Sequence, residues 1–190
     1  MMYKTVYIFR HSQSVDNKNG IFSGWRDSPL TKFGISQARK IAKKLKGKKI
    51  DLAFSSDQKR ALQTAHEVLK YHPDVPIIVD ARLRERDYGK LTGTSKLAFQ
   101  KKNPRLYEVF HRSYATPPPG GESFKMVNER VRPFIRDMLK IMKSYKVNVA
   151  ISAHGNSIRP LRKHFEKLTN DQMRRIENPQ DKYWTYKVKV

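Results

Sequence analysis

The chain has 190 residues and no cysteine, which excludes a disulfide framework and a thiolate metal site. No apolar run approaches the length of a membrane span, and no signal segment precedes the first apolar run, so we expect one cytoplasmic domain over residues 1–190. The net charge of +23 admits nucleic acid, anionic surfaces or phosphorylated ligands as partners. We favour a solvated, lysine-rich surface over nucleic-acid binding, because the lysines are spread along predicted helices without a basic and aromatic recognition motif.

The first part of the chain alternates short apolar runs with amphipathic helical patterns. This β-α-β-α-β order predicts a mostly parallel sheet with right-handed crossovers. The long polar loop in it is expected to be functional, as loops of this length usually are. The expected elements, in chain order, are a strand at about 4–9, the loop over 12–29, a helix from a Thr31 cap to about Lys46, a strand at 52–55, a helix capped by Ser56 or Asp57, and a strand at 76–79.

The second part is less regular in its middle and regular again toward its end. Residues 82–93 are too densely charged for a plain helix, and the proline-rich stretch 116–121 predicts a stiff loop. The other expected elements are a helical stretch over 95–110 broken near Pro104, a helix over 122–144, a strand at 147–152, a helix with Ile158, Leu161, Phe165 and Leu168 inward, and an edge strand at 183–190.

Two of the predicted strands end in a histidine. Arg10 and His11 follow the first strand, and His154 follows the late strand together with small residues. Parallel strands deliver their carboxyl ends to one edge of the sheet, where open α/β sheets build their sites. One such histidine is more often a core residue, but two at strand ends predict a shared crevice. A histidine there can be a nucleophile, and an arginine can bind phosphate.

Further charged residues fall at comparable positions. Arg60 lies in the first turn of the second helix, Glu85 follows the third strand, and helix starts near Asp57 and Asn156 would add N–H donors. Together these groups suit phosphoryl transfer, which needs cations, an in-line nucleophile and an acid for the leaving oxygen. The sequence has neither a Walker loop nor a carboxylate cluster suited to magnesium, so we favour metal-free transfer through a phosphohistidine.

Six segments in a fixed order carry a family resemblance. They are Arg10–Ser14, Phe22–Thr31, Ser55–Ala61, Leu83–Leu91, Phe110–Tyr114 with Pro117–Pro119, and Ala153–Arg159; Asn17 adds one matching position. The set resembles the motifs of the histidine phosphatase superfamily, and most closely those of the cofactor-dependent phosphoglycerate mutases of glycolysis and gluconeogenesis. The resemblance implies a three-layer α/β/α fold with a mostly parallel sheet.

The resemblance also implies residue roles. His11 would be the phosphorylated nucleophile, Glu85 the proton donor and acceptor, and 2,3-bisphosphoglycerate the phosphoryl primer, with no metal. Arg10, Arg60 and His154 would bind the transferred phosphoryl group. The substrate-binding set would be Ser14, Asn17, Ser23, Gly24, Tyr88, Lys96, Arg112, Gly155 and Asn156. The expected partner is a small phosphorylated substrate, and a homodimer is one possible assembly.

The chain departs from the family pattern in ways that leave alternatives open. Ser12 replaces a glycine beside the nucleophile, Asp16 replaces a tryptophan, and His111 replaces an arginine of the substrate site. The segment after Pro119 is short, and a more open site would admit water to a phosphohistidine. A metal-independent phosphatase of broad phosphomonoester specificity is therefore the second hypothesis. A non-catalytic protein that binds nucleic acid or other anions is the third.

Overall fold

The computed structural model describes residues 2–190, except for the side chain of Arg112. Five strands form one sheet in the order β3-β2-β4-β1-β5, and only β5 runs antiparallel to its neighbour. The mostly parallel α/β fold predicted from the sequence is thus confirmed. The strands are β1 (Tyr3–Arg10), β2 (Leu52–Ser55), β3 (Ile77–Val79), β4 (Val149–Ala153) and β5 (Tyr183–Lys189).

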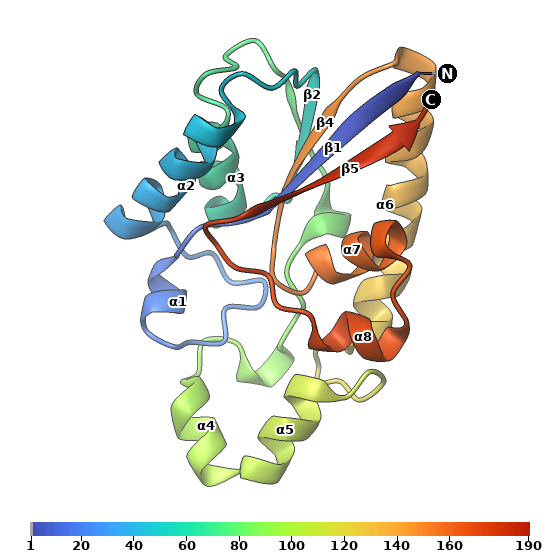
Figure 1. Ribbon diagram of the computed structural model, residues 1–190. Coiled ribbons are helices and arrows are strands. Elements are labelled where there is room, and N and C mark those ends of the chain that lie inside the picture. The colour runs from blue at the N-terminus through green and yellow to red at the C-terminus, as the bar shows by residue number, and fades with distance from the viewer. Residues whose placement is uncertain (1) are drawn as a thin grey trace.

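Helices cover both faces of the sheet, which gives three layers (Figure 1). Helices α2 (Lys32–Leu45) and α3 (Lys59–Val68) pack on the face that carries Tyr7 and Phe9 of β1. Helices α6 (Phe124–Tyr145) and α7 (Ile158–Glu166) pack on the face that carries Ile8. Successive side chains of a strand alternate between faces, so the unbroken apolar run of β1 supplies both cores.

Most predicted boundaries lie within two residues of the observed ones, and the differences have identifiable causes. Thr31 caps α2 as predicted, since its hydroxyl accepts a bond from the Gly34 amide. Neither Ser56 nor Asp57 caps α3; the cap is Gln58, whose side chain makes no cap bond. Ser56 bonds to His154 instead, and Asp57 pairs with Arg84. Both side chains that could have capped α3 instead contact residues that are distant in the sequence.

The structure contains short helices that the sequence analysis did not predict. Helix α1 (Val15–Lys18) lies within the long polar loop and begins with a capping box between Ser14 and Asn17. Helix α8 (Asn170–Arg175) begins with a second capping box, between Thr169 and Gln172. Thr169 and Gln172 have the residue types of the sequence signal for a helix start, whereas the first box has Asn17 in place of Glu or Gln. The charged middle region contains only the 3₁₀ turns η1 (Ala81–Leu83) and η2 (Gly89–Leu91).

A helical hairpin stands apart from the sheet. It consists of α4 (Lys96–Lys102) and α5 (Pro104–Arg112), separated at Asn103 by the break predicted near Pro104 (Figure 1). Aromatic rings attach the hairpin to the long loop, because Phe22 packs against Phe99, Tyr107 and Tyr88 with ring centroids 4.8–6.4 Å apart. Within residues 2–190, no helix has the length and apolar character needed to cross a membrane.

Candidate active site

A cavity of about 140 Å³ lies where β1 and β4 end, next to the α4–α5 hairpin. His11 follows β1 directly, and its amide donates a 2.8 Å bond to the Ala153 carbonyl of β4. His154 follows β4, and the centroids of the two imidazole rings are 4.9 Å apart. The parallel pairing of β1 with β4 therefore brings together the two histidines that the sequence placed at separate strand ends.

His11 is held as a neutral imidazole. Its Nδ1 lies 2.8 Å from the Ser12 carbonyl, and because a carbonyl only accepts, Nδ1 carries the proton and Nε2 the lone pair. Burial lowers the pKa of His11 well below its usual value, and the positive charges of Arg60 and Arg10 lower it further. A neutral, oriented imidazole of this kind is a competent nucleophile. Ser12 has no left-handed backbone, so this position does not require glycine.

His154 is fully buried beside His11. Its Nε2 lies 2.6 Å from the Ser56 hydroxyl, which fixes the ring against the start of α3. Burial also lowers the pKa of His154 well below its usual value, with a further contribution from Arg60. Both imidazoles are therefore uncharged at neutral pH, and the positive charge of the pocket comes from the arginines.

Arg10 and Arg60 supply that charge. Arg60 is 1 % exposed, and it donates to the carbonyls of Arg26 and Gly24, each at 2.9 Å. Arg10 donates a 3.0 Å bond to the carbonyl of Asn178. Burial lowers the pKa of both guanidinium groups, and each has a buried Nε without a hydrogen-bond partner among the described residues. Two cations that carbonyls hold in place, Arg60 buried and Arg10 half-buried, favour binding of an anion.

Glu85 lies beside the two imidazoles, with one carboxylate oxygen within 4.8 Å of a ring nitrogen of each. Its Oε1 accepts bonds from the amides of Arg86 at 2.8 Å and Asn156 at 3.1 Å. These two donors leave Oε2 as the oxygen that can carry a proton. The Glu85 carbonyl accepts from Trp25 Nε1 at 2.8 Å and from Arg130 Nη2 at 2.9 Å, so its backbone is also fixed. This placement suits a general acid.

The structure brings most of the predicted substrate-binding residues to the same cavity. Ser14 does not line it: its hydroxyl caps α1 and holds Asn17, which does. The side chain of Arg112 lies outside the described residues. His111, Arg159, Glu177 and Asn178 line the cavity as well and were not in the predicted set. The predicted residues that line it are Asn17, Ser23, Gly24, Tyr88, Lys96, Gly155 and Asn156.

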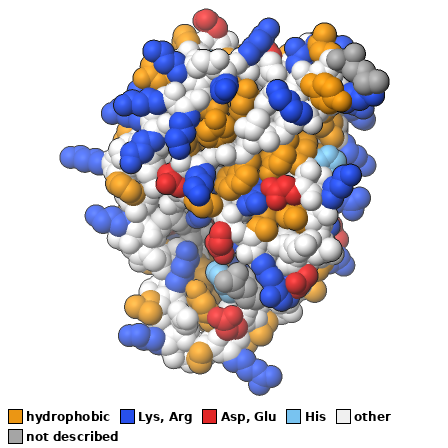
Figure 2. Space-filling model, viewed as in Figure 1, with side chains coloured by type: hydrophobic (Ala, Val, Ile, Leu, Met, Phe, Trp, Pro, Cys, Tyr) orange, Lys and Arg blue, Asp and Glu red, His pale blue; other side chains and the backbone are white. Residues whose placement is uncertain are grey.

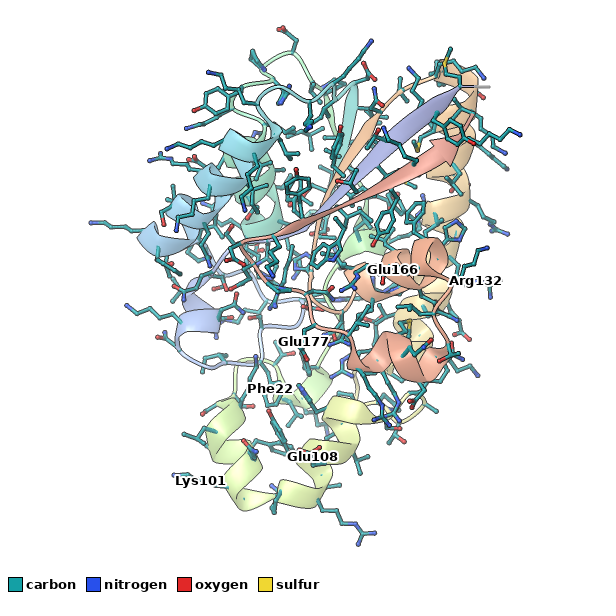
Figure 3. All side chains as sticks on the ribbon, in the orientation of Figure 1. Phe22, Lys101, Glu108, Arg132, Glu166 and Glu177 are labelled. Atoms are coloured by element: carbon teal, nitrogen blue, oxygen red, sulfur yellow. The ribbon has the colours of Figure 1, made fainter. Side chains whose placement is uncertain are left out.

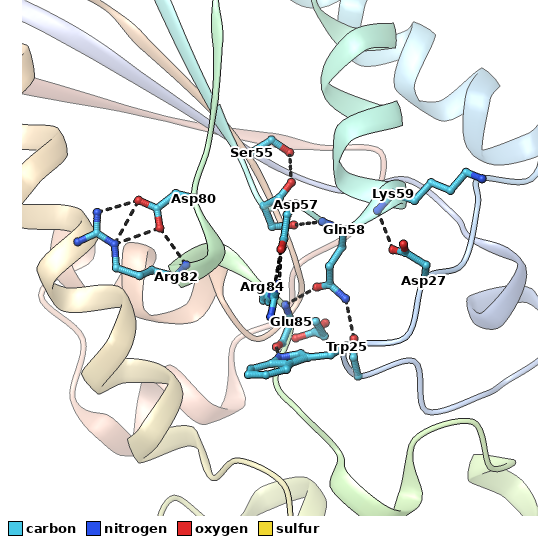
Figure 4. Close-up of polar contacts among 12 residues, drawn as sticks. Trp25, Asp27, Ser55, Asp57, Gln58, Lys59, Asp80, Arg82, Arg84 and Glu85 are labelled. Carbon is cyan, nitrogen blue, oxygen red and sulfur yellow. Dashed lines mark hydrogen bonds and ion pairs between the residues drawn. The ribbon is translucent and has the colours of Figure 1, made fainter.

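Gln58 is a positioning residue that the sequence analysis missed. It is 3 % exposed; its Oε1 accepts from the Glu85 amide at 2.8 Å, and its Nε2 donates to the Gly24 carbonyl at 2.9 Å. Figure 4 shows its side-chain amide between Glu85 and the loop that carries Trp25. Gln58 thus connects the acid to the loop that Arg60 also binds. No pattern in the local sequence indicates this role, because the burial of Gln58 and its contacts are seen only in the structure.

The two histidines and Glu85 are also the residue types that bind metal ions. One ligand atom each from His11, Glu85 and His154 lies within 4.8 Å of the others. A cation at this place would face the guanidinium groups of Arg10 and Arg60, and like charges at such range repel. The site therefore favours an anion over a metal ion, and metal-free chemistry stays our prediction.

The fold and site together define an α/β protein whose cavity presents a neutral imidazole, two guanidinium groups and a carboxyl group to an anion. Residues 6–186 match the histidine phosphatase superfamily (branch 1), and the chain belongs to this superfamily.

Curated relatives and solved structures support this assignment in different ways. A 2,3-bisphosphoglycerate-dependent phosphoglycerate mutase of Parvibaculum lavamentivorans is 39 % identical over 90 % of this chain and 84 % of its own length. One from Methylobacterium sp. (strain 4-46) is 40 % identical over 93 % and 87 %. The solved mycobacterial glucosyl-3-phosphoglycerate phosphatase has a TM-score of 0.85 over 98 % of this chain and 91 % of its own, at 24 % identity, which shows the fold alone. Bacillus stearothermophilus YhfR has a TM-score of 0.81 at 27 % identity, over 90 % of this chain and 83 % of its own.

Proposed function

We propose that the protein is a 2,3-bisphosphoglycerate-dependent phosphoglycerate mutase that interconverts 3-phosphoglycerate and 2-phosphoglycerate in glycolysis and gluconeogenesis. One observation carries the proposal: the cavity has polar groups beyond those that would hold the transferred phosphoryl group. Lys96 and Asn156 line it, and Ser23 contributes a buried hydroxyl without a hydrogen-bond partner among the described residues. These groups suit a second acidic group of the ligand.

The size of the cavity also supports a small substrate. Its volume of about 140 Å³ is below the roughly 300–1,000 Å³ typical of sites for drug-sized ligands. A three-carbon phosphorylated acid fits that scale, whereas a substrate with an attached sugar or nucleoside would extend beyond it. The curated relatives bear mutase names, in agreement with a small substrate.

In the proposed reaction, Nε2 of His11 attacks the phosphorus atom, and a phosphorus–nitrogen bond forms as the bond to the substrate oxygen breaks. Arg10 and Arg60 neutralise the charge on the phosphoryl oxygens. Glu85 protonates the departing oxygen and takes a proton back when a hydroxyl group of the substrate attacks the phosphohistidine. When bound, 2,3-bisphosphoglycerate supplies the phosphoryl group that primes His11. The unpartnered Ser23 hydroxyl and Lys96 suit its second phosphate.

A phosphatase of broad phosphomonoester specificity is the second candidate. His111 lines the cavity at the position where the mutase pattern has an arginine, so one permanent cation of the substrate site is replaced by a titratable group. A weaker hold on the second acidic group favours loss of the substrate before it can attack the phosphohistidine, and water then completes hydrolysis.

An assay with 3-phosphoglycerate separates the two candidates. A mutase produces 2-phosphoglycerate, and its rate rises when 2,3-bisphosphoglycerate is added. A phosphatase releases inorganic phosphate with no 2-phosphoglycerate, and this result would refute the mutase proposal. Comparison of His111→Arg with the unmodified protein tests whether His111 is the cause of any hydrolysis that accompanies isomerisation. The variant should show a lower ratio of hydrolysis to isomerisation.

We also propose that the protein acts in the cytoplasm and that its partner is the small phosphorylated substrate. A homodimer remains a prediction. Sedimentation of the purified protein would test the assembly independently of the activity.

A further inference from the structure

The segment 176–182, between α8 and β5, forms one wall of the active-site cavity through Glu177 and Asn178. Asn178 is 3 % exposed and makes three bonds. Its carbonyl accepts from Arg10 at 3.0 Å, its Nδ2 donates to the Gly155 carbonyl at 2.7 Å, and its Oδ1 accepts from Arg162 at 3.0 Å. The segment is therefore fastened directly to two residues of the phosphoryl-binding pocket.

Glu177 precedes this anchor and has a different environment. Its backbone carbonyl accepts a 2.8 Å bond from Arg162, which also donates to the side chain of Asn178. Its side chain is exposed and lines the cavity. Figure 3 shows Glu177 in the region where the α4–α5 hairpin faces the rest of the molecule. The carboxylate interacts electrostatically with Arg10, but the two form no ion pair.

Glu177 is a negatively charged residue in a cavity whose charged side chains are mostly cationic. Arg10, Arg60, Lys96 and Arg159 are cationic, and the only other carboxylate among the described lining residues is Glu85. Glu85 has a role in proton transfer, whereas Glu177 has none in the proposed chemistry. A carboxylate beside a site for ligands with two or three acidic groups lowers the affinity for them, because like charges repel across a partly screened distance.

We propose that Glu177 is a specificity-determining residue that weakens binding of anionic ligands, and most strongly of those that carry an acidic group besides the transferred phosphate. This inference rests on the proposed function, because it assumes a ligand with an acidic group besides the transferred phosphate. Glu177 speeds release of bisphosphorylated and carboxylated ligands, and so shifts the balance between isomerisation and hydrolysis toward hydrolysis.

The test compares Glu177→Gln with Glu129→Gln. Glu129 is exposed on α6, outside this cavity, so the control changes the net charge equally. Calorimetry with 3-phosphoglycerate should show roughly three- to tenfold tighter binding by Glu177→Gln, the scale of one partly screened charge. The KM for 4-nitrophenyl phosphate, whose only acidic group is the phosphoryl group, should change by less than about twofold. Glu129→Gln should match the unmodified protein with both ligands.

An equal change in the affinity for 3-phosphoglycerate and in the KM for 4-nitrophenyl phosphate would overturn the inference. Glu177 would then act through Arg10 on the phosphoryl group. Unchanged or weaker binding of 3-phosphoglycerate by Glu177→Gln would overturn it too. If Glu177→Gln binds 3-phosphoglycerate more tightly while the unmodified enzyme forms no 2-phosphoglycerate, the proposed mutase function fails and the role of Glu177 stands.

Discussion

At the scale of single residues, burial sets the charge of two histidines of the site, and hydrogen bonds orient the carboxyl group of Glu85. Burial keeps His11 and His154 neutral, and the Glu85 carboxyl group accepts two backbone bonds at one oxygen only. Because both imidazoles are buried as neutral groups, the free energy of unfolding should fall at low pH. In the proposed reaction, proton donation by Glu85 matters only for substrates with a poor leaving group.

Replacement of Glu85 by glutamine tests the last point. Glu85→Gln should lower kcat with 3-phosphoglycerate by about 10²–10⁴-fold, the usual range for a lost general acid. The loss with 4-nitrophenyl phosphate should be far smaller, because nitrophenolate leaves without a proton. Initial rates with the two substrates measure the difference. Equal losses would show that Glu85 shapes the pocket and does not donate a proton.

The free energy of unfolding should fall as the pH falls below about 6.5, the unperturbed pKa of histidine. The pKa of each buried imidazole is lower in the folded than in the unfolded chain, so the unfolded state binds more protons in this range. Two such groups give a slope of up to about 2.7 kcal/mol per pH unit. Urea denaturation between pH 5.5 and 7.5 measures it.

The control for this slope is His66→Gln, because His66 is exposed on α3. That variant should keep the slope. Substitution of both His11 and His154 by glutamine should remove most of it. A stability that is flat across this pH range in the unmodified protein would contradict the neutral state of the two imidazoles.

At the scale of elements, close backbone packing holds the loops that carry the acid. Gly89, at the start of η2, has a φ of +53°, and a Cβ there would lie 2.2 Å from the Pro119 carbonyl oxygen. Gly89→Ala should lower the free energy of unfolding by more than about 1–2 kcal/mol, from the left-handed backbone alone. Gly47→Ala is the matched control, because a Cβ at Gly47 meets no atom within 4 Å. Equal stability of the two variants would contradict this packing.

The sequence predicted the layered sheet well, because β1, β2 and the inward faces of α2 and α6 have local apolar patterns. It located His11 and His154 for the same reason, since each follows a buried strand. The sequence did not predict residues whose role depends on contacts with distant segments of the chain. Gln58 acts through Gly24 and Glu85, and Asn178 bonds to Arg10 across 168 positions of the chain. No periodicity or spacing within one segment reports such contacts.

At the scale of the whole molecule, charge is the dominant feature. The chain has 40 lysines and arginines against 17 acidic residues. Figure 2 shows blue side chains dispersed over the visible face, which also carries hydrophobic patches. Every lysine of the described residues is at least partly exposed, as expected for a solvated surface. Two arginines differ, because Arg60, which lines the cavity, and Arg86, which follows Glu85, are almost fully buried.

Self-repulsion of this surface predicts that salt stabilises the fold. The Debye length falls from about 30 Å at 0.01 M to about 8 Å at 0.15 M, so added salt screens the repulsion between like charges. The Tm should therefore rise with sodium chloride over this range. Chloride is chosen over phosphate, because phosphate would also bind the active site. A Tm that falls with added salt would show that attractive ion pairs outweigh the repulsion.

The central claim is that His11 receives the phosphoryl group, and its most direct test is chemical. After incubation with 2,3-bisphosphoglycerate, the intact protein should gain one phosphoryl group that is labile in acid and stable in base. Peptide mapping under alkaline conditions should place it on His11, and His11→Ala should not be labelled. Stoichiometric labelling of His11→Ala, or a phosphoryl group that is stable in acid, would contradict the account.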